Sequence, residues 1–288
     1  MKKNLPVYTI RHFKEFKSGE DVYANYFVPH ITNHHIATTP HKHDFYLIVF
    51  FTAGKGSHEI DFNTYPIKPG SVFVMNPGQM HNWKFSDDID GYVFFHSRQF
   101  YDEGFTKESI QDYPFFSSLH NPPLVQLKKS SLPNMKLLFE EIVSEYKSGE
   151  FLRFEKLHAL MTLVYIELTR QYELVKVPEN ENYLARVRML EELIDMNFKT
   201  KKYPYEYAAL MNISEKHLNR MSKSCLNKTT SDLIAERIIL EAKRILIHSK
   251  LSVSEVAFEL GYEDNSYFSR FFKKQTGETP VEFMKQYQ

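Results

Sequence analysis

The feature that most constrains the fold is the segment Leu251–Pro280 near the C-terminus, which predicts two short helices joined by a tight turn. Ser252 can cap the first helix, and Glu255, three residues later, can reach back to complete a capping box. Gly261 suits the left-handed conformation that ends a helix and reverses the chain. Asp264 can then cap the second helix. The segment therefore predicts a helical hairpin.

The second of these helices has two contrasting faces. Its phenylalanines, Phe268, Phe271 and Phe272, fall on one side. Its short polar and cationic side chains fall on the other: Ser266, Ser269, Arg270 and Lys273. Such a helix suits the major groove of DNA, because Arg can bind guanine with two hydrogen bonds and Lys neutralises phosphate. Spacing alone is equally compatible with an ordinary amphipathic hairpin.

The segment GYEDNSYFSRFFKKQTGETP, with the upstream SVSEVAFELG, resembles the second helix-turn-helix of the AraC/XylS transcription regulators. The resemblance extends from about Tyr183 to the C-terminus. It implies an all-α domain with helix-turn-helix motifs at about residues 205–225 and 253–274. Ser214 can cap the reading helix of the first motif. A long helix over residues 231–249 would hold the two reading helices about one DNA turn apart, ~34 Å.

The helix faces and the resemblance together give the candidate DNA contacts. Arg220 and Arg270 are the first choices for reading bases, since Arg matches the guanine edge. Five neighbours are expected to support base reading: Lys216, Asn219, Ser266, Tyr267 and Ser269. Three lysines are expected to contact phosphates: Lys223, Lys273 and Lys274.

Charge is unevenly distributed along the chain. Residues 183–288 carry 17 Lys and Arg against 14 Asp and Glu, whereas residues 1–182 carry 19 against 22. This is the sign expected of a basic DNA-binding domain joined to a slightly acidic domain. The lone Cys225 excludes an internal disulfide and a four-cysteine zinc site. With no secretory signal and no long apolar run, we expect a cytoplasmic protein that does not contact membranes.

Residues 1–130 predict a β-rich domain. Short runs such as DFYLIVFFTAG and SVFVMNPG are separated by Gly, Pro, Asn and Asp turns, which is typical of a sandwich or small barrel. Alternation from residue 41 to 51 places one set of side chains on a common strand face: His41, His43, Phe45, Leu47 and Val49. The order HKHDFY, then GKGSHEIDF to GQMHNW, resembles the cupin-like sensor domain of many AraC/XylS members over residues 23–100.

This second resemblance implies a ligand-binding set: His41, His43, Phe45, His81 and Trp83. Three imidazoles could also bind Zn, Fe or Ni, as in metal-binding cupins. The metal pattern of cupins has a carboxylate where this chain has Leu47, so we expect no metal and no other cofactor. The histidines are expected to line a ligand pocket or to hydrogen-bond in the core. Trp83 is equally suited to a pocket wall and to the core.

Residues 131–172 change to a helical period. Two apolar stripes predict two helices: Met135, Leu138, Phe139, Ile142, Val143 and Tyr146, then Phe154, Leu157, Met161, Val164, Leu168 and Tyr172. The AraC/XylS resemblance implies that these helices form a homodimer seam, and the alternative is that both stripes pack on the barrel. Residues 173–182 predict an exposed linker. The expected organisation is a sensor domain (1–130), a helical dimerisation region (131–172), the linker (173–182) and a DNA-binding domain (183–288).

The predicted fold class is α+β: a cupin-like β-barrel or sandwich, the helical region and an all-α double helix-turn-helix domain. The predicted function is a ligand-responsive bacterial transcription factor without catalytic residues. Its expected partners are double-stranded promoter DNA, a small-molecule effector and, for an activator, RNA polymerase. The alternatives are a metal-dependent cupin enzyme that binds iron through His41, His43 and His81, and a ligand-free regulator controlled by its own abundance.

Overall fold

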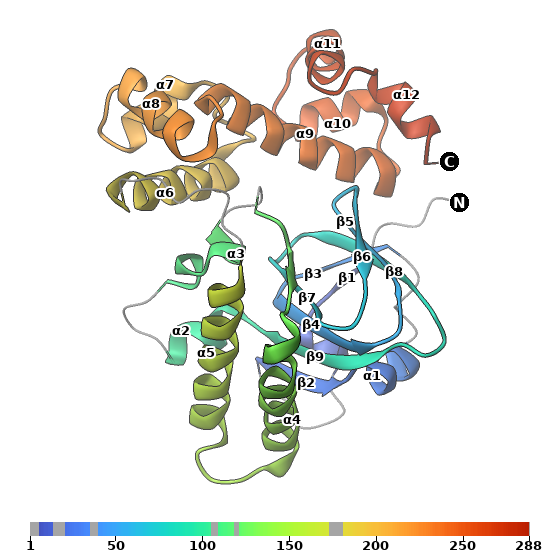
Figure 1. The fold of residues 1–288 in the computed structure, drawn as a ribbon. Coiled ribbons are helices and arrows are strands. Elements are labelled where there is room, and N and C mark those ends of the chain that lie inside the picture. The colour runs from blue at the N-terminus through green and yellow to red at the C-terminus, as the bar shows by residue number, and fades with distance from the viewer. Residues whose placement is uncertain are drawn as a thin grey trace. The chain divides into compact units, whose positions relative to one another are not determined.

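The computed structural model describes residues 6–13, 21–34, 40–104, 109–117, 121–172 and 181–287. The chain divides into two compact units, with the boundary between Leu174 and Val175. The first unit is a β-sandwich with helices, and the second is entirely helical over its described residues (Figure 1). None of the helices in these ranges combines the length and the apolar composition that a membrane crossing needs.

The first unit contains two five-stranded sheets, which confirms the predicted sandwich. Sheet A has the order β1 (Val7–Tyr8), β3 (His41–His43), β8 (Met80–Phe85), β5 (Gly56–Ile60), β6 (Asn63–Ile67). Sheet B has the order β10 (Leu124–Gln126), β7 (Ser71–Met75), β4 (Tyr46–Ala53), β9 (Asp90–His96), β2 (Val22–Tyr26). The paired strands are antiparallel except for β1 and β3. The flanking helices are η1 (Ile10–Phe13), α1 (Phe27–His34), α2 (Arg98–Gly104), η2 (Ile110–Asp112), α3 (Pro114–Ser117) and η3 (Lys129–Ser131).

The single strand face predicted from His41 to Val49 is wrong, because the chain changes sheets between β3 and β4. The residues nevertheless face the same interior. Phe45, at the change of sheet, stacks on Phe95 with 4.7 Å between ring centroids. Leu47 pairs with Phe95 across β4 and β9, so it shares that inner face. Side chains still alternate between the two faces within β3 and within β4. The pattern of residue types does not show where the chain leaves one sheet and enters the other.

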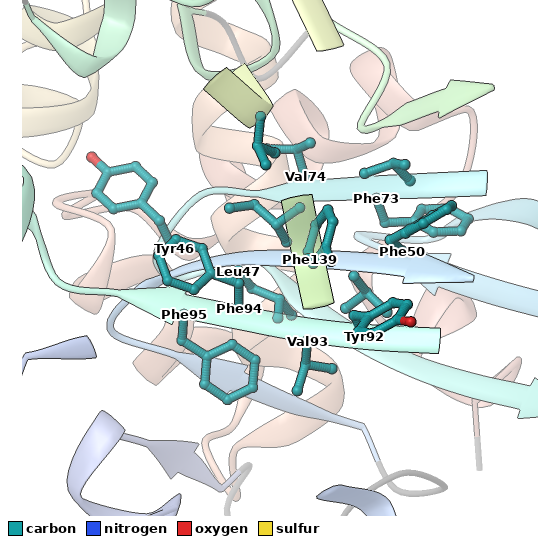
Figure 2. Packing of buried hydrophobic residues seen from close by; sticks show 14 of the residues in the cluster. Tyr46, Leu47, Phe50, Phe73, Val74, Tyr92, Val93, Phe94, Phe95 and Phe139 are labelled. Carbon is teal, nitrogen blue, oxygen red and sulfur yellow. The ribbon is translucent and has the colours of Figure 1, made fainter. Parts of the chain in front are cut away.

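Sheet B is covered on its outer face by α4 (Leu132–Ser148) and α5 (Arg153–Gln171). Phe139 of α4 packs against Phe50 and Tyr92, at ring distances of 5.5 and 5.7 Å (Figure 2). Strand β4 is therefore buried on both faces, which explains its unbroken apolar run. The two predicted helices are confirmed, and α4 ends at Gly149, whose φ is 68°.

The assignment of the two apolar stripes to a dimer seam is wrong. Eleven of these side chains lie in the core of the first unit: Met135, Leu138, Phe139, Ile142, Val143, Tyr146, Leu157, Met161, Val164, Leu168 and Tyr172. Phe154 remains 38% exposed. The stripes pack on the sandwich because sheet B has a second apolar face that needs cover. Helices α4 and α5 accordingly fall in the same unit as the sheets.

The second unit consists of seven helices over the described residues 181–287. They are α6 (Glu181–Asn197), α7 (Pro204–Leu210), α8 (Glu215–Leu226), α9 (Thr230–His248), α10 (Val253–Glu259), α11 (Asn265–Thr276) and α12 (Pro280–Lys285). The predicted caps are confirmed at Ser214, at Ser252 with Glu255, and at Asp264. Eight residues of the predicted linker, 173–180, lie outside the described ranges, and its last two residues begin α6.

The segment that follows α6 is joined to the end of α10 by a lysine. The Nζ of Lys202 donates to the carbonyl oxygens of Phe198, Lys199 and Leu260, at 2.6, 2.9 and 2.5 Å. Burial lowers the pKa of Lys202 to about 8, so the ammonium is still mostly protonated at pH 7. Gly261 makes this approach possible, because a Cβ on it would lie 1.9 Å from the Lys199 carbonyl oxygen.

Two glycines of the second unit provide a matched test of this junction. Gly261 and Gly277 both have left-handed φ values, +78° and +88°, but only Gly261 has atoms within 4 Å of an added Cβ. Gly277→Ala should cost only the left-handed strain of about 1–2 kcal/mol. Gly261→Ala should cost more, because the methyl group displaces Lys199. Urea unfolding followed by circular dichroism would measure both, and equal costs would contradict the close approach.

The interior of the first unit also holds buried histidines. Burial lowers the pKa of His30 to about 3 and that of His96 to about 4. The Nδ1 of His30 lies 3.1 Å from the Tyr23 hydroxyl. The Nδ1–H of His96 donates to the Ser97 carbonyl oxygen, and its Nε2 accepts from the Tyr165 hydroxyl. Each ring is therefore held in its neutral form.

These two histidines should make the sandwich sensitive to acid. Below pH 6.5 the unfolded chain binds protons that the folded chain binds only near pH 3–4, so the free energy of unfolding should fall as pH drops from about 6.5 towards 4. Each histidine contributes up to about 1.4 kcal/mol per pH unit. Urea unfolding monitored by the single tryptophan, Trp83, would report this slope. His30→Gln should lower this slope by about one proton. An unaltered slope in His30→Gln would refute the assignment.

Candidate functional site

Helices α8 and α11 are equivalent parts of a repeated structure. Each has 12 residues, and each ends at a left-handed residue, Asn227 with φ 54° or Gly277 with φ 88°. Arg220 and Arg270 are both the sixth residue of their helix. The two arginines therefore occupy the same position relative to the cap and to the buried side of each hairpin, which the spacing of residues in sequence did not reveal.

Helix α11 has the two faces that its sequence predicted. Phe268 and Phe272 are fully buried, and Phe272 packs against Phe283 of α12 at 5.7 Å. The exposed side carries Ser266, Tyr267, Arg270, Lys273 and Lys274, and Ser269 is half-buried beside them. The Asp264 carboxylate accepts from the backbone N–H groups of Ser266 and Tyr267, so the helix start is fixed.

Helix α8 is anchored by Leu218 and Met221, which are fully buried, and it exposes Lys216, Arg220 and Lys223. The Nη2 of Arg220 donates to the Nδ1 of His217 at 2.8 Å. The ring of Tyr183, from α6, lies 5.7 Å from the His217 ring and 6.0 Å from the Arg220 guanidinium. His217 and Tyr183 thus orient Arg220, and neither was among the residues predicted from the sequence. The three-residue spacing of His217 and Arg220 was the available signal.

Asn219 has a structural partner that the sequence did not predict. Its Oδ1 accepts from the backbone N–H of Thr230, the first residue of α9, at 3.2 Å. Reading adenine with two hydrogen bonds would require both the oxygen and the nitrogen of the Asn219 amide. The oxygen instead holds the end of α8 against the start of α9.

Helix α9 links the two reading hairpins. It has 19 residues and therefore spans about 28 Å, near the ~34 Å of one DNA turn. Its start contacts α8 through Thr230, and the Nζ of Lys243 near its other end lies 5.3 Å from the Phe283 ring of α12. The expectation of one long helix between two reading helices is confirmed.

The second group of candidate residues lies inside the sandwich on the inner face of sheet A. His41 pairs with His81 across β3 and β8, and His58 pairs with Trp83 across β5 and β8. These four side chains and His43 are at most 4% exposed. Strands β3, β5 and β8 thus bring together the histidines and Trp83 that were predicted from the sequence. They also bring in His58, which was not predicted. The signal for His58 was its alternation with Ile60, but only strand pairing places it beside His81.

The histidines contact one another directly. The Nε2 atoms of His43 and His81 lie 2.6 Å apart, and the Nδ1 of His81 lies 2.8 Å from the Nε2 of His58. One ligand nitrogen from each of His41, His43 and His81 lies within 4.8 Å of the other two. Burial lowers the pKa of His43, His58 and His81 well below 6.5, so these imidazoles are neutral.

Aromatic side chains enclose this cluster. The Trp83 ring lies 4.6 Å from that of His81, and the Phe45 ring lies 4.5 Å from that of His43. Tyr8, which precedes η1, lies 5.3 Å from His41. All five predicted ligand-binding residues are therefore neighbours. His43 and His81 hydrogen-bond with each other in the core, which is one of the two roles expected for the histidines.

Comparison with known proteins follows the same two-part division. Residues 26–158 match the AraC-like ligand binding domain, and residues 207–286 match a helix-turn-helix domain. The transcriptional activator RhaR of Mannheimia succiniciproducens is 21% identical over 255 residues, which cover 86% of this chain and 87% of RhaR. The activator RhaS of an Enterobacter species is 24% identical over 245 residues, covering 84% and 86%.

Among solved structures, ToxT from Vibrio cholerae covers 92% of this chain and 98% of its own, at 12% identity and a TM-score of 0.45. The two family domains occur in the order that the sequence predicted, and each coincides with one candidate site. The chain belongs to the AraC/XylS family and is a ligand-responsive transcription factor that binds DNA through two helix-turn-helix motifs.

Proposed function

We propose that α8 and α11 read promoter DNA from two successive major grooves, with Arg220 and Arg270 as the principal base-reading residues. The observation that carries this proposal is their equivalence: both are exposed, and both are the sixth residue of a 12-residue helix whose other face is buried. Arginine is the side chain best matched to the two acceptors of guanine. The ~28 Å length of α9 supports engagement of neighbouring grooves on one side of the duplex.

The other exposed side chains of these helices have subordinate roles in the proposal. Lys223, Lys273 and Lys274 neutralise phosphates and make affinity fall with salt. Five residues assist base reading or approach the sugar-phosphate backbone: Lys216, Asn219, Ser266, Tyr267 and Ser269. Asn219 acts mainly by holding α8 against α9, because its amide oxygen is already engaged.

The sensor part of the proposal places the effector at the histidine cluster, in contact with His41, His43, Phe45, His81 and Trp83. The Nδ1 atoms of His43 and His58 and the Nε1 of Trp83 are buried without a hydrogen-bond partner among the described residues. Unpaired buried polar atoms cost free energy, so an occupant that satisfied them would bind with a gain. Such an occupant shifts the protein between two DNA-binding arrangements only if it prefers one of them.

The proposed homodimer uses the outward side of α4 and α5, which lie side by side (Figure 1). Several apolar side chains are exposed there and in the connection between the helices: Leu137, Phe151, Leu152, Phe154, Leu163 and Ile166. On α5, Leu163 and Ile166 follow helical spacing on the side away from the core. Exposed apolar clusters of this kind mark interaction surfaces. The proposed dimer acts in the cytoplasm. It is an activator that contacts RNA polymerase. This function requires no catalysis.

The DNA contacts can be tested by fluorescence anisotropy with an operator and a random duplex. Arg270→Ala and Arg220→Ala should each weaken operator binding by about 1–3 kcal/mol and relax one base preference. Lys273→Ala should weaken both duplexes alike and reduce the salt dependence. Lys84→Ala, in the exposed part of β8, is the control and should bind as the parent does. Unchanged operator affinity in both arginine variants would disprove the groove assignment.

The dimer surface can be tested by sedimentation of the full chain. Ile166→Glu and Leu163→Glu place a charge in the exposed apolar surface and should shift the protein from dimer to monomer, because burying an unpaired charge is costly. Lys84→Glu places a glutamate on the exposed part of sheet A, with an even larger change in net charge, and should remain dimeric. A dimer that survives both helix variants, or a parent that is monomeric at all concentrations, would exclude this surface.

A further inference from the structure

We propose that His41, His43 and His81 form a binding site for one divalent transition-metal ion such as Zn²⁺, with His58 orienting His81 from behind. This inference names the occupant of the sensor interior and in that respect rests on the proposed function of that unit. It is independent of the DNA contacts assigned to α8 and α11.

The positions of the three rings are set by strand pairing. His41 and His81 are cross-strand partners, and His43 lies on the same face of β3. Their ligand nitrogens already lie within 4.8 Å of one another. Tetrahedral zinc with Zn–N bonds of 2.0–2.1 Å separates its nitrogen ligands by about 3.3 Å. On metal binding the 2.6 Å between the Nε2 atoms of His43 and His81 would widen by about 0.7 Å, and a separation of up to 4.8 Å would shorten by about 1.5 Å through side-chain rotation.

The hydrogen bonds within the cluster cannot satisfy it alone. A neutral imidazole carries one proton, and both nitrogens of His81 face other histidines. If His81 donates to His58, the outer Nδ1 of His58 carries the proton and that of His43 is a bare lone pair. If His81 donates to His43, these roles reverse. In both cases a buried N–H and a buried lone pair lack partners among the described residues, which is costly in an apolar interior.

A metal ion would replace the proton that lies between the Nε2 atoms of His43 and His81 at the centre of the cluster. It would leave the outer Nδ1 atoms of His43 and His58 without partners among the described residues. The Nε2 atoms of His43 and His81 point at each other, and a cation lets both contribute a lone pair to one point. His81 then keeps its proton on Nδ1 and donates it to His58, the arrangement in which a second residue fixes the orientation of a metal-bound imidazole. Each neutral imidazole has one lone pair to offer to a metal ion.

The packing of the rings favours an ion over an organic molecule among these three residues. The ring centroids of His41 and His81 are 4.3 Å apart, and His43 lies 4.8 Å from each of them. These are contact distances for aromatic rings. An organic effector would have to push the rings apart, whereas a metal ion occupies the space between ligand nitrogens.

Three neutral imidazoles leave a divalent ion with its full charge in a buried site. Leu47, where a carboxylate ligand was considered, lies on β4 of sheet B and supplies no charge. A fourth coordination position would therefore favour hydroxide or another small anion over a neutral ligand. In the sequence, the missing carboxylate favours the absence of a metal, but three histidines with an open position are a sufficient zinc-binding set.

The test uses Co²⁺, whose visible absorption reports tetrahedral nitrogen coordination and whose unpaired electrons quench nearby fluorescence. Trp83 is the only tryptophan and lies 4.6 Å from the His81 ring. Titration of the metal-free full chain with CoCl₂ should quench Trp83, produce visible bands and saturate at one ion per chain. ZnCl₂ should reverse both signals by competition.

Variants separate the ligands from other buried histidines. His43→Asn and His81→Asn should abolish the visible bands, and His58→Asn should weaken Co²⁺ binding roughly 10–100-fold, as expected for a residue that orients a ligand. His96→Asn removes an equally buried histidine at the α5 side and should bind Co²⁺ like the parent. If His81→Asn does not fold, as judged by circular dichroism, the metal site is tested by His43→Asn and by the number of Co²⁺ ions bound per parent chain.

A folded parent that shows neither visible bands nor saturable quenching with CoCl₂ would overturn the metal site. Equal binding by the parent and His43→Asn would also overturn it. Operator binding with and without ZnCl₂ is measured separately. If Zn²⁺ binds at one equivalent but operator affinity is unchanged, the metal site stands and the regulatory role of the sensor interior fails. If operator binding fails in every condition while Co²⁺ binds, only the DNA assignment fails.

Discussion

The burial of sheet B on both faces is the constraint on which the first unit depends. Its inner side chains, such as Phe95, form one wall of the histidine-containing interior, and its outer side chains, such as Phe50, require the cover of α4 and α5. An apolar strand with no solvent-facing side must lie in the middle layer of three. The interior chemistry and the exposed helix surface are therefore consequences of the same sheet.

In the second unit, each reading helix has one face packed in the domain core and the opposite face exposed to solvent. Phe268 and Leu218 occupy the buried side of their helices, and backbone caps hold the helix starts. The long α9 and the Lys202 junction then connect the two hairpins, so that neither arginine is carried on a flexible loop. Rigid placement matters for base reading because hydrogen bonds to base edges tolerate little displacement.

The two units use polar side chains under opposite conditions. The arginines and lysines that we propose as DNA contacts on α8 and α11 are exposed, as attraction to an external polyanion requires. The histidines of the sandwich are buried and neutral, and the Nδ1 atoms of His43 and His58 have no hydrogen-bond partner among the described residues. A regulator needs both properties, since the ligand is sensed in one unit and the DNA is bound by the other.

The sequence by itself determined the local features: the helix caps at Ser252 and Asp264, the reading helices, the β-rich first half and the residue types that line the sensor. These depend on neighbours within a few positions, so periodicity and turn residues reveal them. Only the tertiary structure decided that the chain changes sheets after His43, that the stripes of α4 and α5 are buried, and that His58 completes the cluster. These features depend on which strands pair and which faces pack, and such long-range choices are made by the whole fold.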